Sequence, residues 1–295
     1  MFSEERNLPA FDYTTAFQRN LGFISAEEQL RLRRARIAIA GLGGTGGAQA
    51  QALARMGIGG FTLADPDTFE LANFNRQTGA FMSTIGRGKA EVAAEIIQDI
   101  NPEAKIRLFE QGIDAENIDA FLEGANVVVD SLDFYCFEER FLLYRKAREH
   151  GLWVLTAPPL GFGFTLLCFD PNGMSFERYF GFHPGMAEHD LVVALVAGLA
   201  PRPYILRYLK PQGADLKGRR LPSVGAAPFM IAGVIATEVT QILLKESKPL
   251  AVPTIYQFDA RLRCFKRQTL RWGMNSPWQR FKRWLLSRKL SRQSL

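Results

Sequence analysis

The chain has 295 residues, enough for one large domain with an embellishment, and 47% of them are hydrophobic, as is usual in globular proteins. Its three cysteines, Cys136, Cys168 and Cys264, are too widely spaced for a disulfide scaffold or a zinc site, so zinc is not expected. The net charge is +6, but residues 261–295 hold eleven Lys or Arg and no Asp or Glu, which leaves about −5 on residues 1–260.

The N-terminus lacks the pattern of a signal peptide, because residues 1–6 are charged and no apolar run follows them. The longest apolar stretches are interrupted by charges such as Glu188, Asp190 and Glu238. We therefore expect none of them to reach the roughly 20 residues of a membrane span. The sequence favours a cytoplasmic protein.

In the first half, short apolar runs alternate with helical patterns, and Ser25 and Glu28 form a capping box at the start of one helix. The pattern predicts helices at 25–34, 47–56 and 87–100, and strands at 36–40, 60–65, 104–108, 126–130 and 153–156. Such alternation is typical of an α/β fold with a doubly wound, mostly parallel, Rossmann-like sheet. Ligands of such sheets bind at the carboxyl edge of the strands.

The second half is less regular. It predicts an antiparallel strand at 162–169, a turn at 170–173, an excursion at 179–222, a long helix at 226–245, and strands at 254–258 and 263–266. We divide the chain into an N-terminal helical arm (1–35), a main domain (36–270) with an antiparallel extension of its sheet, and a basic tail (271–295).

A run of glycines follows the first strand and opens a helix. Gly41, Gly43, Gly44 and Gly46 allow a tight turn whose backbone can approach a phosphate at the helix N-terminus. Asp65, at the end of the second strand, is placed to hold ribose hydroxyls. This pattern alone does not distinguish an NAD-binding domain from a domain that activates substrates with a nucleotide.

Five further segments, each a modest motif, are specific in combination. They are DPDTFELANFNRQ at 65–77, GRGKAE at 86–91, INP at 100–102, SLD at 131–133 and PSVGAAP at 222–228. In these segments the chain resembles the ThiF/MoeB/HesA family, the adenylyltransferase superfamily that includes the ubiquitin-activating enzymes. The resemblance covers about residues 16–170 and 221–258.

The resemblance implies an enzyme that uses ATP and Mg²⁺ to adenylate a carboxylate. Charge accumulates on phosphate oxygens during that reaction, so cations must be aimed at them. The implied catalytic residues are Arg76, Lys89 and Asp133, with Asp133 as the Mg²⁺ ligand and Asp130 as its helper. The implied nucleotide-binding residues are Gly41, Gly43, Gly44, Gly46, Asp65, Asp67, Asn73 and Gln77. Without the motif, Lys89 would be a solvated surface charge and Asp133 a helix cap.

Arg19 resembles an arginine that, in the family, reaches into the ATP site of the neighbouring subunit. It is the fourth implied catalytic residue, and it implies a homodimer with shared sites. The chain also departs from the family. Phe134 stands where asparagine is usual, and Arg140 is our candidate to replace a helix arginine at another offset. The excursion at 179–222 contains no cysteine, which argues against a thioester step.

Several hypotheses stay open. The carboxylate is the C-terminus of a small ubiquitin-like sulfur carrier or of a peptide, or the protein resembles the TcdA-like members that act on a modified base of tRNA. A third hypothesis is a nucleotide-binding partner without turnover, and an NAD oxidoreductase is the least favoured. The tail at 277–290 mixes aromatic and basic residues. The hypotheses for it are contact with an anionic membrane, RNA or an acidic partner, or a terminal helix that is solvated or packed locally.

Overall fold

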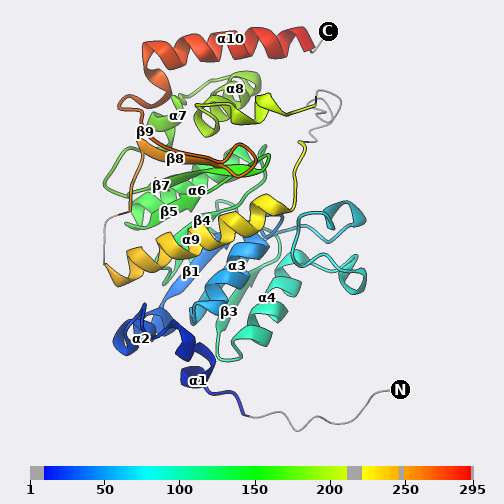
Figure 1. Cartoon of the computed structure of the whole chain (residues 1–295), viewed down its shortest axis with the longest axis vertical. Helices are drawn as coiled ribbons and strands as arrows, with labels where there is room; N and C mark the ends of the chain where they lie inside the picture. Colours follow the sequence, from blue (N-terminus) through cyan, green and yellow to red (C-terminus); the bar gives the residue numbers. More distant parts are fainter. Residues whose placement is uncertain (1–9, 211–220, 246–248, 294–295) are drawn as a thin grey trace.

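The computed structural model describes residues 10–210, 221–245 and 249–293 (Figure 1). A nine-stranded sheet runs through the molecule in the order β3-β2-β1-β4-β5-β7-β8-β9, with β6 paired to β7. The parallel strands are β1 (Arg36–Ala40), β2 (Gly60–Ala64), β3 (Lys105–Phe109), β4 (Val127–Asp130) and β5 (Trp153–Thr156). The antiparallel strands are β6 (Pro159–Leu160), β7 (Gly163–Phe169), β8 (Thr254–Asp259) and β9 (Cys264–Thr269). The expected Rossmann-like α/β sheet with an antiparallel extension is confirmed.

Helices cover both faces of the sheet, and β1 shows why. Ile37 and Ile39 point into one apolar core, while Ala38 and Ala40 point into the other. The first core also takes α2 (Ala26–Arg34), α3 (Gly46–Arg55), α4 (Lys89–Ile100) and α9 (Ala226–Leu244). The second takes α5 (Ile118–Leu122), α6 (Phe137–Glu149), α7 (Phe176–Phe180) and α8 (Glu188–Leu199). Because both faces of such a strand are buried, its sequence is a continuous run of apolar residues.

The strand order reverses direction beside β1. The chain builds outward from β1 through β2 to β3, then crosses back to β4 on the other side of β1. The carboxyl ends of β1 and β4 therefore diverge at a topological switch point, where open α/β sheets bind ligands.

The N-terminal arm consists of α1 (Tyr13–Phe17), the 3₁₀ helix η1 (Gln18–Asn20) and α2. The predicted capping box of α2 is present at Ser25 and Glu28. The hydroxyl of Tyr13 donates a hydrogen bond of 2.6 Å to the carbonyl of Gly57. The arm is thereby fixed against the turn that follows α3, at the end of the sheet where β2 begins.

The expectation that no apolar stretch approaches the length of a membrane span is wrong for α9. This helix has 19 residues and a mean hydropathy of 1.6, and among the described residues it alone meets the criteria of length and composition for crossing a membrane. Glu238 is its one acidic residue. Half of the helix is buried inside the molecule, where Ile231, Ile235 and Val239 join the first core.

The sequence patterns do not predict helix α6. The reason is that its buried face contains a charged residue, Arg140. Phe137, Arg140, Leu143, Tyr144 and Ala147 are its buried residues, and their spacing is helical. Arg140 interrupts the apolar pattern by which a buried helix is usually detected. The basic tail forms α10 (Pro277–Gln293), which lies across one end of the molecule, next to α8 (Figure 1).

Candidate functional site

The glycine turn between β1 and α3 is pressed against the end of β4. Gly41 has a φ of +87°, and a Cβ atom there would lie 2.2 Å from the carbonyl oxygen of Ser131. A Cβ at Gly46 would lie 1.9 Å from the carbonyl oxygen of Gly41. No larger residue fits at either position without moving backbone. The turn thus brings the N-terminus of α3, with its free N–H groups, to the switch point.

Asp65 joins this turn to the end of β2. One carboxylate oxygen accepts a hydrogen bond of 2.6 Å from the N–H of Leu42, and the other accepts one of 2.9 Å from the N–H of Asp67. Burial raises the pKa of the Asp65 carboxyl, and the nearby Lys89 opposes that rise. Each oxygen keeps further acceptor capacity, which suits the proposed contact with ribose hydroxyls.

Lys89 is buried, which excludes the alternative of a solvated surface charge. It is the first residue of α4, and its ammonium group lies 2.8 Å from a carboxylate oxygen of Asp67. A continuous series of contacts therefore leads from the glycine turn through Asp65 and Asp67 to this cation.

Arg76 and Gln77 approach the glycine turn from the segment after β2. A Cβ at Gly44 would lie 3.7 Å from Cγ of Arg76, and one at Gly43 would lie 3.6 Å from Nε2 of Gln77. Asn73 positions both residues, because its carbonyl accepts hydrogen bonds from their backbone N–H groups at 3.1 and 2.9 Å. The Asn73 side chain accepts a hydrogen bond of 3.0 Å from the N–H of Glu70, which stabilises the short helical turn at Leu71–Asn73.

The start of α9 lies beside the same segment. The side chain of Asn75 donates a hydrogen bond of 2.9 Å to the carbonyl of Ser223. A Cβ at Gly225 would lie 2.3 Å from the carbonyl oxygen of Asn75. The motif at 222–228 is thus brought next to the motif at 65–77, although almost 150 residues separate them in sequence.

Three buried polar atoms around the glycine turn have no hydrogen-bond partner in the described part of the chain: Oε1 of Gln77, Oγ1 of Thr78 and Nε2 of Gln49. Ser131 donates a bond of 2.6 Å to the other end of the Gln49 amide. Unpaired buried polar groups are costly, so they mark positions where a ligand or water completes the structure. Gln49 and Thr78 are not among the site residues expected from the sequence. For Gln49, the available signal is a polar residue within a helix that is otherwise rich in alanine and glycine.

Asp130 and Asp133 have different environments. Asp130 is buried, and its carboxylate accepts bonds of 3.0 Å from Nε of Arg140, 3.0 Å from the hydroxyl of Tyr144 and 3.1 Å from the N–H of Leu132. Asp133 is exposed, and its carboxylate makes no hydrogen bond or ion pair with any residue that the structure describes. Of the two candidate Mg²⁺ ligands, Asp133 is therefore the one with free oxygens.

The donor set fits a magnesium ion that is shared with a nucleotide. Within the described ranges, no three His, Cys, Asp or Glu side chains gather into a cage for a metal. Mg²⁺ commonly takes only one or two carboxylates from the protein, and phosphates and water supply the rest. Asp133 follows Ser131 and Leu132, whose backbone touches Gly41, so it belongs to the segment next to the glycine turn.

The guanidinium of Arg140 is engaged within the protein and is not free to hold a phosphate. It is buried and donates to the carbonyls of Leu132 at 2.6 Å and Asp133 at 3.0 Å, besides its ion pair with Asp130. It therefore shapes the segment that carries Asp133. Phe134 lies in the same segment, and its ring contacts the rings of Tyr135 and Phe137 edge to face.

Arg19 lies away from these residues within one chain. It is exposed on η1, in the arm that is fixed to Gly57 beyond the carboxyl end of α3. The glycine turn lies at the amino end of that ten-residue helix, about 15 Å away along its axis. Contacts thus link Arg76 and, through Asp65 and Asp67, Lys89 to the glycine turn. Asp133 lies in the segment after Ser131, whose backbone touches the turn, and Arg19 lies away from it.

The model of the ThiF family matches residues 17–275. A sulfur carrier protein adenylyltransferase of Thermus thermophilus is 28% identical over 86% of this chain and 85% of its own length. A tRNA threonylcarbamoyladenosine dehydratase of Haemophilus influenzae is 42% identical over 40% of this chain, and the match spans only 46% of that protein.

Two solved structures share the fold. PaaA matches 91% of this chain and 76% of its own with a TM-score of 0.66 and 17% identity. MccB of E. coli matches 90% of this chain and 71% of its own with a TM-score of 0.64 and 18% identity. At these identities the likeness extends to the fold alone.

Proposed function

Because the chain belongs to the ThiF family, we propose that it is an adenylyltransferase that uses ATP and Mg²⁺ to activate a carboxylate as an acyl-adenylate. The observation that supports the proposal is that Arg76 lies against Gly44 of the glycine turn, and that contacts through Asp65 and Asp67 link the same turn to Lys89. A plain NAD oxidoreductase would leave these two cations without a role.

In the proposed reaction, an oxygen of the substrate carboxylate attacks the α-phosphorus of ATP. The bond from that phosphorus to the oxygen bridging to the β-phosphorus breaks, and pyrophosphate leaves with the bonding electrons. Arg76 and the N–H groups that begin α3 hold phosphate oxygens, and Lys89 balances the buried charge near Asp65. Bound Mg²⁺, held by Asp133, would neutralise charge on the phosphates. The chain need supply no nucleophile.

The proposed substrate is the C-terminal carboxylate of a small ubiquitin-like protein or of a peptide. The relative from Thermus thermophilus supports this class, because it matches over most of both chains and is named for a sulfur carrier protein. The test is ATP–pyrophosphate exchange with the purified protein and small carrier proteins that end in Gly-Gly. We expect exchange that requires both the carrier and Mg²⁺. A complete lack of exchange with carriers, peptides and tRNA would defeat the proposal.

A second candidate is the activation of a carboxylate on tRNA. It is supported by the 42% identity to the dehydratase, although the matched segment spans about half of that protein. The modified nucleoside in that protein's name carries the carboxylate of a threonyl group. Pyrophosphate release that depends on tRNA bearing this nucleoside, and not on a carrier protein, would select this substrate.

We also propose a homodimer in which Arg19 completes the partner's site, which its place far from the glycine turn supports. Arg19→Ala and Arg76→Ala should each be inactive alone. When the two are mixed and allowed to exchange subunits, one intact site forms in each mixed dimer, so about a quarter of wild-type exchange activity should return. Mixing that restores no activity would show that Arg19 acts in its own subunit or has no part in the site.

Adenylation without a thioester predicts that the cysteine nearest the site is dispensable. Cys136 is half-buried at the start of α6, and burial raises the pKa of its thiol to about 11. It is therefore almost entirely a protonated, weak nucleophile at neutral pH. We expect Cys136→Ala to keep ATP–pyrophosphate exchange within about twofold of wild type. A covalent carrier adduct, cleaved by thiols and absent from this variant, would contradict the prediction.

A further inference from the structure

The orientation of α10 on the protein is the reverse of what hydrophobic burial favours. The side that faces the body is largely polar and basic: Gln279 is buried, Lys282 donates a bond of 3.0 Å to the carbonyl of Pro201, and His189 of α8 lies 3.1 Å from the hydroxyl of Ser287. Arg283 approaches Gly181, and burial lowers the pKa of its guanidinium. Polar contacts, with Leu286 as an apolar one, thus attach the helix.

The opposite side of α10 is aromatic and exposed. Trp278, Phe281, Trp284 and Leu285 keep 63%, 46%, 47% and 47% of their surface in contact with solvent. Their spacing places them along one side of the helix. Hydrophobic burial alone would favour the opposite orientation, with these side chains against α8. In the observed orientation they are exposed for contact with another surface.

Cations accompany this apolar strip, and acids do not. Arg280 and Arg288 are exposed on α10, and the sequence from 261 to 295 contains no Asp or Glu. An apolar strip flanked by cations is complementary to a surface with apolar material beneath a layer of negative charge.

The ring contacts argue against nucleic acid as the occupant. Phe281 stacks between Trp278 and Trp284, with ring centres 5.8 Å apart on both sides. The guanidinium of Arg288 lies 4.1 Å from the centre of the Trp284 ring, and the ammonium of Lys282 lies 5.5 Å from that of Trp278. A neighbouring ring or cation therefore takes up part of the face of each of these rings, which leaves less of it for a nucleobase to stack on.

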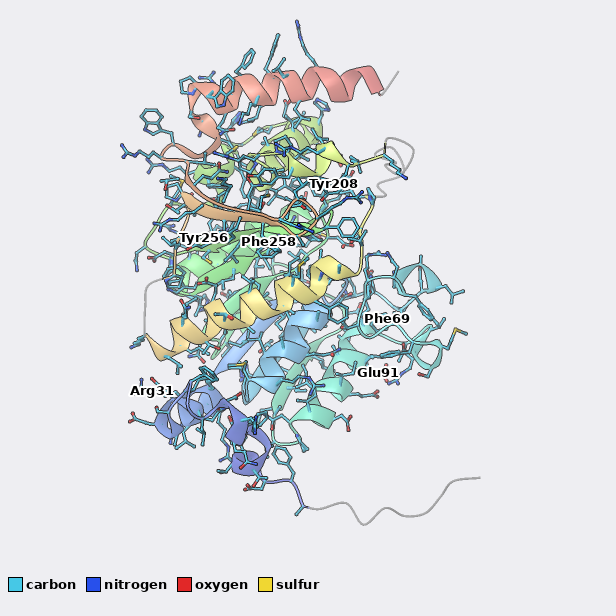
Figure 2. The ribbon with its side chains drawn as sticks, viewed as in Figure 1. Arg31, Phe69, Glu91, Tyr208, Tyr256 and Phe258 are labelled. Atoms are coloured by element: carbon cyan, nitrogen blue, oxygen red, sulfur yellow. The ribbon has the colours of Figure 1, made fainter. Side chains whose placement is uncertain are left out.

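From these observations we propose that the exposed strip of α10 binds the anionic surface of a lipid bilayer. The helix has 17 residues, about 25 Å, and lies across one end of the molecule. Figure 2 shows several side chains of α10 projecting away from the body of the molecule, on the side that a flat surface could approach. The glycine turn and the arm lie away from that end, which leaves the site accessible while the protein is bound.

The test is sedimentation of the full chain with vesicles of phosphatidylcholine, with and without phosphatidylserine. We expect the protein to pellet only with the anionic vesicles and to be released at high salt. The variant W278S/F281S/W284S should lose affinity for them by more than about tenfold. The matched control, F23S/F81S/F229S, removes three exposed rings from other elements and should bind as wild type does.

Other occupants give different results. If the wild type stays in solution with anionic vesicles, or if W278S/F281S/W284S pellets as well as the control, the proposal is overturned. The same holds if the rings are needed for binding an unmodified tRNA transcript while vesicles are not bound. Sedimentation velocity reports the remaining alternative: self-association that depends on the rings, without vesicle binding, would make the strip a contact between copies.

Discussion

Replacing Arg76 by alanine is expected to reduce ATP–pyrophosphate exchange by about 10²–10³-fold, because a cation aimed at developing phosphate charge is lost. The Arg76 side chain lies against Gly44, where a phosphate would rest on the turn. One of its nitrogens is held by the carbonyl of Ala72 at 2.8 Å and the side chain of Asn75 at 2.9 Å. These bonds orient the guanidinium before any ligand binds, so its removal should lower the rate without unfolding the protein.

The matched control is Arg87→Ala. Arg87 belongs to the neighbouring motif and is an arginine of similar exposure, but its guanidinium is paired with Glu91 and Glu95 on the surface of α4. Surface ion pairs contribute little, so this variant should keep both its exchange rate and its melting temperature. If Arg76→Ala and Arg87→Ala had the same effect, the site assignment would be wrong.

Replacing Asp130 by asparagine is expected to cause the largest loss of stability. The change keeps the shape of the side chain but removes the charge that balances the buried guanidinium of Arg140. Breaking a buried ion pair on one side costs about 3–5 kcal/mol, because the other charge stays buried without compensation. For a chain of this size the melting temperature should fall by on the order of 10 °C, as measured by calorimetry.

The variant to compare with Asp130→Asn is Asp133→Asn. The Asp133 carboxylate is exposed and makes no hydrogen bond or ion pair with the described part of the protein, so the melting temperature of this variant should stay within about 1 °C of wild type. Exchange activity should nevertheless fall steeply and should respond weakly to added Mg²⁺. The opposite pattern, with activity lost in a folded Asp130→Asn and kept in Asp133→Asn, would move the metal to Asp130.

The parts of the fold that were predictable are those governed by local patterns. Strands β1 and β5 begin and end where the apolar runs do, and the Ser25 capping box marks the start of α2. The turn at 170–173 is also present, with the N–H of Gly173 bonded to the carbonyl of Asp170. In each case the cause lies within a few residues, so the sequence contains it.

The features that escaped prediction depend on contacts between distant segments. Nothing near Arg140 indicates that Asp130 neutralises it, since the pairing requires β4 and α6 to be packed together. The same holds for Gln49, whose partner Ser131 is 82 residues away. The family motif names candidate site residues where spacing alone cannot. It proposes Asp130 as a helper of Asp133, and it gives no sign that the Asp130 carboxylate is paired with Arg140 and Tyr144.

The close approach of Gly41, Gly46 and the backbone of Ser131 has a consequence for how ATP binds. Three chain segments meet there by direct backbone contact, so the surface beneath the phosphates takes its final shape when the sheet folds. A nucleotide would not need to immobilise this part of the chain, and little conformational entropy would be lost on binding. Hydrogen exchange at the amides of the turn should then be nearly as slow in the free protein as in the ATP-bound one.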